Sequence, residues 1–207
     1  MREVAHFALP RSVFFYRGLR DARKRVALTF DDGPNAMTPL YLDVLARLGV
    51  RATFFLVGEN AARMPGLVAD YVRCGHEVGG HGWSHAAFSS LRGSRLEEEL
   101  QRTHEVLGTE VDRHRLVRPP HGALTTRTLV RTAAAGYTSV LWSVDSDDCR
   151  SRDPRLVARR IAPEALESGD VVLLHELQPW TLQALPDAVR RLRDNGWELV
   201  TVTQLMD

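Results

Sequence analysis

The chain has 207 residues, of which 44% are apolar and 26% charged, and its formal net charge is +1. This composition predicts one soluble globular domain, residues 1–207 with a core from 26 to 205. Because acidic and basic residues are interspersed, the charge gives no reason to expect a nucleic-acid partner, and no protein partner is implied. No apolar run approaches the length of a membrane span, so none is expected.

The first twenty residues carry no recognisable secretion signal. Their apolar residues are interrupted by Pro10 and Arg11, so the apolar core of a signal peptide does not form. We therefore expect a cytoplasmic protein from the chain as given, and an extracellular one if a leader has been removed. The two cysteines, Cys74 and Cys149, have no metal-binding spacing and imply no disulfide.

Apolar runs typical of strands alternate with stretches of helical spacing along the chain. About seven runs predict strands, at residues 26–30, 52–57, 76–79, 116–118, 137–144, 171–174 and 198–202. Six stretches predict helices, around residues 42–48, 67–72, 94–107 and 126–135, from 153 onward, and around 182–192. Two of these helices carry start signals, because Ser94 and Glu97 match a capping box and Asp153 precedes Pro154 as a cap.

This alternation predicts an α/β fold with a parallel sheet covered by helices. The strand count is one short of an eight-fold barrel and the chain is short for one, so a distorted, incomplete (β/α) barrel fits best. A doubly wound open sheet is the alternative. No glycine-rich phosphate loop follows the first strand, which argues against the nucleotide-binding version of that sheet.

The first predicted strand runs directly into two carboxylates. Residues 26–30 are apolar, Asp31 and Asp32 follow them, and Gly33 and Pro34 turn the chain. Adjacent carboxylates repel each other unless a metal ion or an arginine lies close to them. Taken alone, the stretch is equally compatible with a surface turn, where Asp and Gly are common.

The other unusual polar residues also follow predicted strands. These residues, at the carboxyl ends of later strands, are His81, His85, Arg118, Asp145, Asp148 and His175. In a parallel barrel the carboxyl ends of the strands form the catalytic face, so we expect all of them to meet Asp31 and Asp32 there.

His81 and His85 form a His-x3-His pair, a spacing that places both imidazoles on one side of a single helical turn. The neighbouring residues Gly79, Gly80 and Gly82 make a long helix unfavourable, so we expect a loop with one turn. With Asp32, the pair offers two imidazoles and a carboxylate. That set suits Zn²⁺ or another first-row divalent ion and leaves positions open for water and substrate.

Six stretches together resemble the polysaccharide deacetylases of the NodB-homology type, carbohydrate esterase family 4. They are TFDDGP (29–34), ATFFLVG (52–58), GHEVGGHGWSH (75–85), RPPHG (118–122), LWSVDSDD (141–148) and VVLLH (171–175). The similarity runs from about Val26 to the C-terminus. The fold of that family is a distorted (β/α) barrel, in agreement with the count of elements.

The resemblance implies a division of roles around a divalent metal ion, with Zn²⁺ favoured and Co²⁺ or another first-row metal compatible. Asp32, His81 and His85 would hold the ion. Asp31 would be the general base that activates water, and Arg118 would pair with Asp31 and set its charge state.

The same resemblance implies the acid side of the reaction and the acetyl pocket. His175 would be the general acid that protonates the leaving amine, and Asp148 would orient it. The backbone N–H of His121 would help to bind the developing oxyanion. Leu173 and Leu174 would line the small pocket for the acetyl group.

Some aromatic residues and some departures from the family pattern bear on the substrate. Trp180 follows His175 closely and is a candidate for contact with a sugar ring, whereas Trp142 lies in an apolar run and is expected in the core. Cys149 stands where the family usually has tryptophan, and His121 stands where it usually has tyrosine. These two changes put the preference for a particular polymer in doubt.

The leading hypothesis is therefore metal-dependent removal of acetyl groups from N-acetylglucosamine-type sugars in chitin oligosaccharide, peptidoglycan or a related glycan. An alternative on the same fold is an amide hydrolase or deformylase acting on another small amide or acetylated intermediate, or an O-deacetylase. A glycan-binding module without catalysis is a third hypothesis, and the presence of every proton-transfer residue argues against it.

Overall fold

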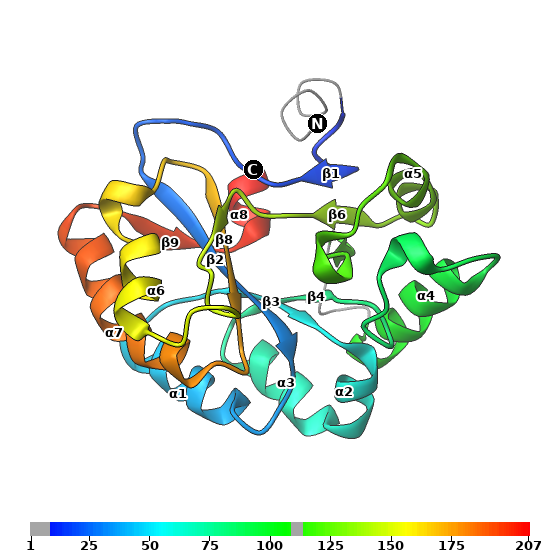
Figure 1. The fold of residues 1–207 in the computed structure, drawn as a ribbon, viewed down its shortest axis with the longest axis horizontal. Coiled ribbons are helices and arrows are strands. Elements are labelled where there is room, and N and C mark those ends of the chain that lie inside the picture. The colour runs from blue at the N-terminus through cyan, green and yellow to red at the C-terminus, as the bar shows by residue number, and fades with distance from the viewer. Residues whose placement is uncertain (1–8, 109–113) are drawn as a thin grey trace.

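The computed structural model describes residues 9–108 and 114–207, in which nine strands form one sheet (Figure 1). Eight of them follow one another in the order β1-β6-β5-β4-β3-β2-β8-β7, and β9 pairs with β2 beside this row. Neighbouring strands are parallel. The strands are β1 (Phe14–Phe15), β2 (Arg25–Gly33), β3 (Thr53–Leu56), β4 (Glu77–Gly80), β5 (Leu116–Val117), β6 (Thr138–Val140), β7 (Val144–Asp145), β8 (Asp170–His175) and β9 (Glu198–Val200).

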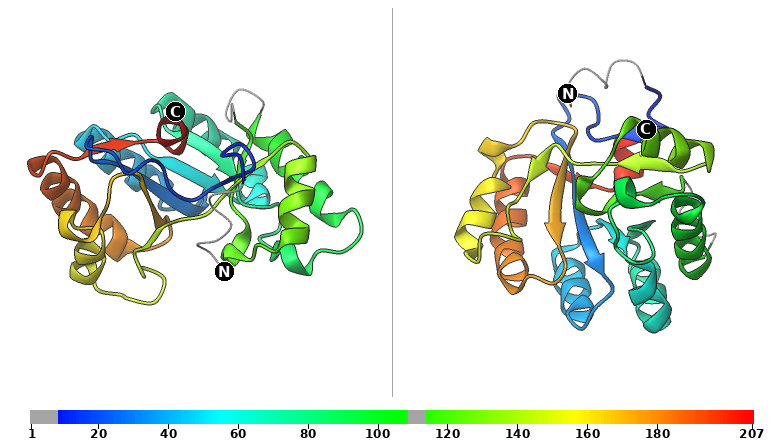
Figure 2. Two further views of the ribbon diagram at one scale, coloured as in Figure 1. Left: turned by 90° about the horizontal axis from the view of Figure 1, so that it is seen from above. Right: turned by 45° about the vertical axis from the view of Figure 1, so that its right-hand side comes forward.

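Helices cover the outer side of this curved sheet and follow one another around it, from α6 and α7 through α1, α3 and α2 to α4 and α5 (Figures 1 and 2). The predicted distorted, incomplete (β/α) barrel is confirmed. None of the helices in the described residues is both long and apolar enough to cross a membrane. The helices are α1 (Thr38–Leu48), α2 (Gly58–Arg63), α3 (Pro65–Arg73), α4 (Arg95–Leu107), α5 (Thr126–Ala134), α6 (Pro154–Arg160), α7 (Pro179–Asp194) and α8 (Val202–Met206).

Side chains along the central strands alternate between the outer face of the sheet, which packs against the helices, and its inner face. In β2, Val26, Leu28 and Phe30 face the helices and join the main core cluster, where the Phe30 ring stacks on that of Phe54 at 5.0 Å. Burying each such side chain contributes roughly 1.5–3 kcal/mol. Thr29 and Asp31 occupy the alternate positions and therefore face the inner side of the sheet.

Most predicted strands are confirmed, but the run 137–144 does not form one strand. Its first part, β6, pairs with β1 and β5, whereas β7 pairs with β8. Between them the backbone crosses from one partner to the other, since the Leu141 amide donates to Phe15 O and the Ser143 amide donates to Val171 O. Because this change of partner depends on distant residues, the local apolar pattern did not predict it.

Helix starts show the same dependence on distant contacts. The cap at Asp153 is confirmed, since its side chain accepts from the Arg155 amide at 2.9 Å. The capping box at Ser94 is wrong, because its hydroxyl bonds to Glu98, and Glu97 pairs with Arg131 of α5. The short elements β1, α2 and α8 were not predicted.

Candidate active site

Predicted residues from several strand ends meet in one open cavity of about 380 Å³ on the inner side of the sheet. Its volume is in the range of small-molecule sites. The expected residues that line it are Asp31, Asp32, His81, His85, His121, Asp145, Leu173 and His175. The cavity therefore brings together most of the residues that sequence reasoning selected.

Asp31 and Asp32 act on the same side of the sheet because β2 is irregular at its end. The register against β3 shifts between Asp31 and Gly33, and Asp32 has a φ of +72°, in the left-handed region. In a regular strand these side chains would point to opposite faces, and a bulge re-aims one of them. Asp31 Oδ2 and Asp32 Oδ1 consequently lie 3.7 and 3.6 Å from Nε2 of His81.

Asp32, His81 and His85 form a group whose ligand atoms all lie within 4.8 Å of one another. Nδ1 of His81 lies 2.7 Å from the backbone oxygen of Arg118. Because a carbonyl oxygen only accepts, Nδ1 carries the proton, and the lone pair of Nε2 is available to a cation bound beside Asp32. Two imidazole nitrogens and one carboxylate oxygen fit Zn²⁺ or another first-row divalent ion and leave coordination positions open.

The charges of this group also suit a cation. Burial lowers the pKa of His81, so the imidazole is neutral, as a metal ligand must be. Burial would raise the pKa of Asp32, but its hydrogen bond with His85 and the nearby imidazoles lower that pKa to about 2. The hydrogen bond with Asp32 raises the pKa of His85, so binding of a cation would release the proton that these two groups share. The Asp32 carboxylate is therefore ionised near neutral pH.

Arg118 lies completely buried behind Asp31. Its Nη1 donates to Oδ1 of Asp31 at 2.7 Å and to the Thr29 hydroxyl at 2.8 Å. Nη2 donates to the Leu141 carbonyl at 3.3 Å, and the guanidinium carbon lies 4.1 Å from the centre of the Phe55 ring. These contacts fix the guanidinium, so it can hold the Asp31 carboxylate in one orientation through a charge-assisted hydrogen bond.

His175 at the end of β8 is held by Asp148. Nδ1 of His175 lies 2.7 Å from Oδ1 of Asp148, whose other oxygen accepts from the His175 amide at 2.8 Å and the Thr181 hydroxyl at 2.7 Å. Burial alone would lower the pKa of His175, but the hydrogen bond and charge of Asp148 raise it to about 11. The imidazole is therefore protonated near neutral pH and has a proton that it can donate.

Comparison with known proteins places the chain in a family. The family model described as polysaccharide deacetylase matches residues 19–140. The chain belongs to the polysaccharide deacetylase family. It is 33% identical over 184 residues to the peptidoglycan-N-acetylglucosamine deacetylase PgdA of Listeria monocytogenes, an alignment that covers 88% of this chain but only 39% of that protein.

Two further relatives match over most of their length. The chitooligosaccharide deacetylase of a Bradyrhizobium strain is 34% identical over 202 residues, covering 88% of this chain and 90% of that protein. The solved structure of a family 4 carbohydrate esterase from Streptomyces lividans in complex with acetate has a TM-score of 0.80 at 33% identity, covering 86% of this chain and 93% of that one. Some similar structures are described as pseudoenzymes, so membership in the deacetylase family does not by itself show catalysis.

Two residues expected at the substrate lie elsewhere in this deacetylase fold. Leu174 is completely buried in the main core cluster, because it alternates with Leu173 along β8 and so faces the helices. Trp180, in the first turn of α7, does not line the cavity; its indole N–H donates to the Asp148 carbonyl at 2.6 Å. Trp180 therefore supports Asp148 from behind.

Trp142, which was expected in the core, packs against one core cluster and also lines the cavity. It lies where the chain crosses from β6 to β7, and its ring packs on Gly122, where a Cβ atom would lie 2.8 Å from Trp142 Cη2. His121 and Cys149, the two residues that differ from the family pattern, line the same cavity. The His121 ring lies 4.6 Å from that of His85. Nothing in the sequence around Trp142 indicates that the strand ends before it, so its place at the cavity could not be predicted.

Proposed function

We propose that the protein is a metal-dependent hydrolase that removes acetyl groups from N-acetylglucosamine-type sugars in an oligo- or polysaccharide. The observation that supports this most strongly is the register of β2 and β8, which makes Asp31 and His175 partners beside the Asp32, His81 and His85 group. A carboxylate paired with an arginine and an imidazole paired with a carboxylate are suited to act as base and acid on one amide.

The residues of the chain would divide the reaction between them. The divalent ion, with Zn²⁺ favoured and Co²⁺ compatible, would polarise the acetyl carbonyl and make water a better nucleophile. Asp31 would accept the proton of the attacking water, with Arg118 stabilising its ionised form. His175 would donate the proton on Nε2 to the nitrogen of the leaving amine, and Asp148 would stabilise the protonated imidazole.

The substrate proposal rests on the cavity and on the relatives. Leu173 lines the cavity with little exposed surface and would contact the acetyl methyl, while the backbone N–H of His121 is proposed to bind the oxyanion. Relatives of this chain are named for peptidoglycan and for chitooligosaccharide. We therefore expect an acetylated carbohydrate as the partner of this site.

The test is acetate release from chitin oligomers, peptidoglycan fragments, acetylated xylan and small acetylated amides, with metal content measured in parallel. We expect release from an N-acetylglucosamine glycan that stops with a chelator and returns with Zn²⁺ or Co²⁺. His81→Ala should lose both metal and activity, whereas Asp31→Asn should keep the metal and lose about two to four decades in turnover.

Other outcomes would redirect the proposal. Acetate from xylan alone would identify an O-deacetylase, and turnover of small amides alone would identify a different amide hydrolase. Glycan binding without acetate from any substrate would leave a binding module. Loss of metal in Asp31→Asn would mean that the roles of Asp31 and Asp32 are reversed.

A further inference from the structure

We propose that Glu99, on α4, is a positioning residue that holds the loop 81–85 in the conformation that brings both of its imidazoles to one metal ion. The inference rests on the proposed function, because it concerns the same metal site. Glu99 does not line the cavity or belong to the ligand group. Its effect would be transmitted through the backbone between His81 and His85.

The carboxylate of Glu99 makes three short hydrogen bonds to this loop. Oε2 accepts from the backbone amides of Trp83 at 2.7 Å and Ser84 at 2.8 Å, and Oε1 accepts from the Ser84 hydroxyl at 2.7 Å. Two successive N–H groups that converge on one oxygen form an anion-binding nest, and hydrogen bonds to a charged acceptor are roughly twice as strong as neutral ones. The loop is therefore closed around a charge supplied by the same chain.

The loop needs such support because its backbone is irregular. Gly82 and His85 have φ values of +75° and +60°, and the left-handed region is unfavourable for a residue with a side chain such as His85. On the other side of the loop, α2 donates its first amides: Gly58 N–H to Gly82 O at 2.9 Å and Glu59 N–H to Trp83 O at 3.0 Å. The amides of α2 therefore donate to the carbonyls of the loop, whereas Glu99 of α4 accepts from its amides.

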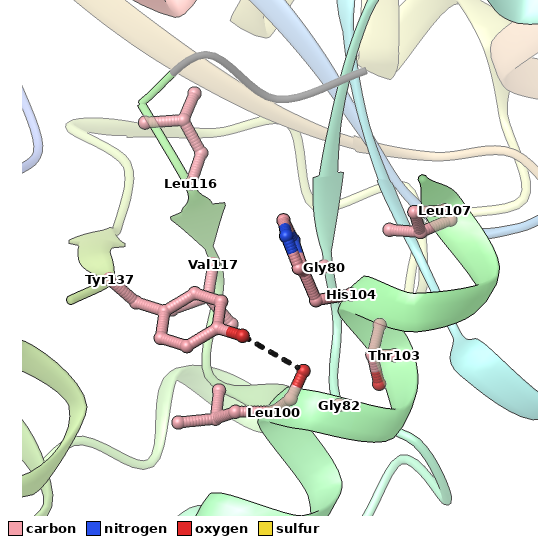
Figure 3. A pocket seen from close by; sticks show the side chains of 9 residues that line it. All are labelled: Gly80, Gly82, Leu100, Thr103, His104, Leu107, Leu116, Val117 and Tyr137. Carbon is pink, nitrogen blue, oxygen red and sulfur yellow. Dashed lines mark hydrogen bonds between the residues drawn. The ribbon is translucent and has the colours of Figure 1, made fainter. Parts of the chain in front are cut away.

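Helix α4 is firmly placed to carry this clamp. Figure 3 shows the packing of α4 against the neighbouring strands, where the Tyr137 hydroxyl donates to the Leu100 carbonyl at 3.3 Å. The gap left there is a cavity of about 10 Å³, room for one water at most. One turn beyond Glu99, the Arg102 guanidinium lies over the Trp83 ring at 3.9 Å. Glu99 and Arg102 therefore hold the loop from one face of a fixed helix.

The neighbouring glutamates of α4 have different partners and provide a matched control. Glu98 is exposed and accepts from the Ser94 hydroxyl, while Glu97 pairs with Arg131. Among the described residues Glu99 forms no ion pair, so its charge is directed at the loop amides. Glu98→Ala removes the same side-chain atoms from the same helix but breaks no hydrogen bond to the loop 81–85, so it is the control for Glu99→Ala.

The experiment compares Glu99→Ala, Glu99→Gln and Glu98→Ala in the full chain. Zn²⁺ affinity is measured by competition with a chromophoric chelator, and hydrogen exchange of the metal-free proteins is measured by mass spectrometry. We expect Glu99→Ala to weaken Zn²⁺ binding about 10- to 100-fold, as loss of an outer-shell partner does. In the same variant the peptide covering 81–85 should lose protection while peptides from β2 and β8 keep theirs. Glu99→Gln should be intermediate, because its amide oxygen can still accept from the two backbone amides, whereas its NH2 group cannot accept from the Ser84 hydroxyl and the charge is lost. Glu98→Ala should match the wild type.

Three results would overturn the inference: wild-type Zn²⁺ affinity in Glu99→Ala, weakened affinity with an unchanged loop, or loss of protection throughout the molecule. The last would mean that Glu99 stabilises the whole fold. Neither readout depends on acetate release. A wild-type protein that binds Zn²⁺ but releases no acetate would therefore contradict the proposed function and leave the role of Glu99 standing.

Discussion

Nδ1 of His175 lies 2.7 Å from Oδ1 of Asp148, and the Asp148 carboxylate is completely buried. A buried carboxylate that accepts this hydrogen bond favours the protonated imidazole, which is why the pKa of His175 is raised to about 11. Asp148→Asn keeps a hydrogen-bond acceptor and removes the charge. We expect the pKa of His175 to fall toward its ordinary value and turnover at neutral pH to fall at least tenfold.

The sign of the pH effect follows from this shift. In the wild type His175 stays protonated well above neutral pH, so it should not limit turnover there. If His175 is the general acid, Asp148→Asn makes it lose its proton at a lower pH, and the alkaline limb of the kcat profile moves down. NMR titration of His175 and kcat profiles measure this, with Asp43→Asn as control, since Asp43 is exposed on α1 and does not line the cavity. An unmoved limb would show that His175 is not the acid.

The second prediction concerns the ion pair between Arg118 and Asp31, in which both side chains are buried. Arg118→Met leaves the Asp31 carboxylate without its cation, and breaking a buried pair in this way costs about 3–5 kcal/mol. Adding Asp31→Asn removes the uncompensated charge, so the double variant should be more stable than Arg118→Met alone. Urea unfolding of the metal-free proteins tests this, and additive losses would contradict it.

The parts of the site that depend on the order of the strands could be predicted, whereas the parts that depend on contacts between distant residues could not. The positions of Asp31, His81 and His175 were predictable, because a parallel sheet brings the carboxyl ends of its strands to one edge. The bulge that aligns Asp31 with Asp32 was not, since it is a feature of pairing with β3. Trp180 was misplaced for a similar reason: its helix packs so that the indole reaches the backbone of Asp148.

Sequence signals for helix starts were also misleading where contacts with distant residues take the place of a side-chain cap. Helix α2 has no side-chain cap at its first turn, because its first amides bond to the loop carbonyls of Gly82 and Trp83. The capping box expected at Ser94 and Glu97 is not formed, because Glu97 pairs with Arg131. Propensity and spacing are weak guides at such positions, since packing overrides them.

The third prediction concerns Glu176, a completely buried carboxyl beneath the turn at Gly33. The Tyr71 hydroxyl lies 2.8 and 2.6 Å from its two oxygens. Burial raises the pKa of Glu176 to about 7, although hydrogen bonds from Thr38 and Tyr71 oppose the shift. The folded state therefore holds a proton that the unfolded chain releases above its own pKa of about 4.5.

A carboxyl whose pKa is raised on folding contributes full stability below its unfolded pKa and loses it as the pH rises through the folded value. Glu176→Gln cannot ionise, so its stability relative to wild type should improve between pH 5 and pH 9, by about 3 kcal/mol. Urea unfolding at pH 5, 7 and 9 measures the difference between the two proteins, which cancels the titration of other groups. A difference that does not change with pH would show that Glu176 is ionised in the folded protein.

The fourth prediction concerns Cys149, which lines the cavity together with His175 and is exposed. The sequence resemblance implies a tryptophan at this position in the family, and the small thiol presents much less apolar surface to the cavity. Trp180 cannot fill the gap while its indole is bonded to the Asp148 carbonyl. Loss of an aromatic contact costs roughly 1–3 kcal/mol, so we expect weak binding of short unbranched chitin oligomers.

Cys149→Trp tests whether the open side serves a bulkier substrate. The variant should bind chitin oligomers more tightly, with KM lowered by about tenfold or more, because the indole supplies the missing apolar surface. On a bulkier acetylated glycan the same indole should obstruct the group that occupies the gap, and kcat/KM should fall. Cys74→Ser is the control, since that cysteine is exposed and does not line the cavity. Unchanged kinetics on both substrates would mean that the sugar does not reach position 149, and the bound glycan would then have to extend over Trp142 and His121.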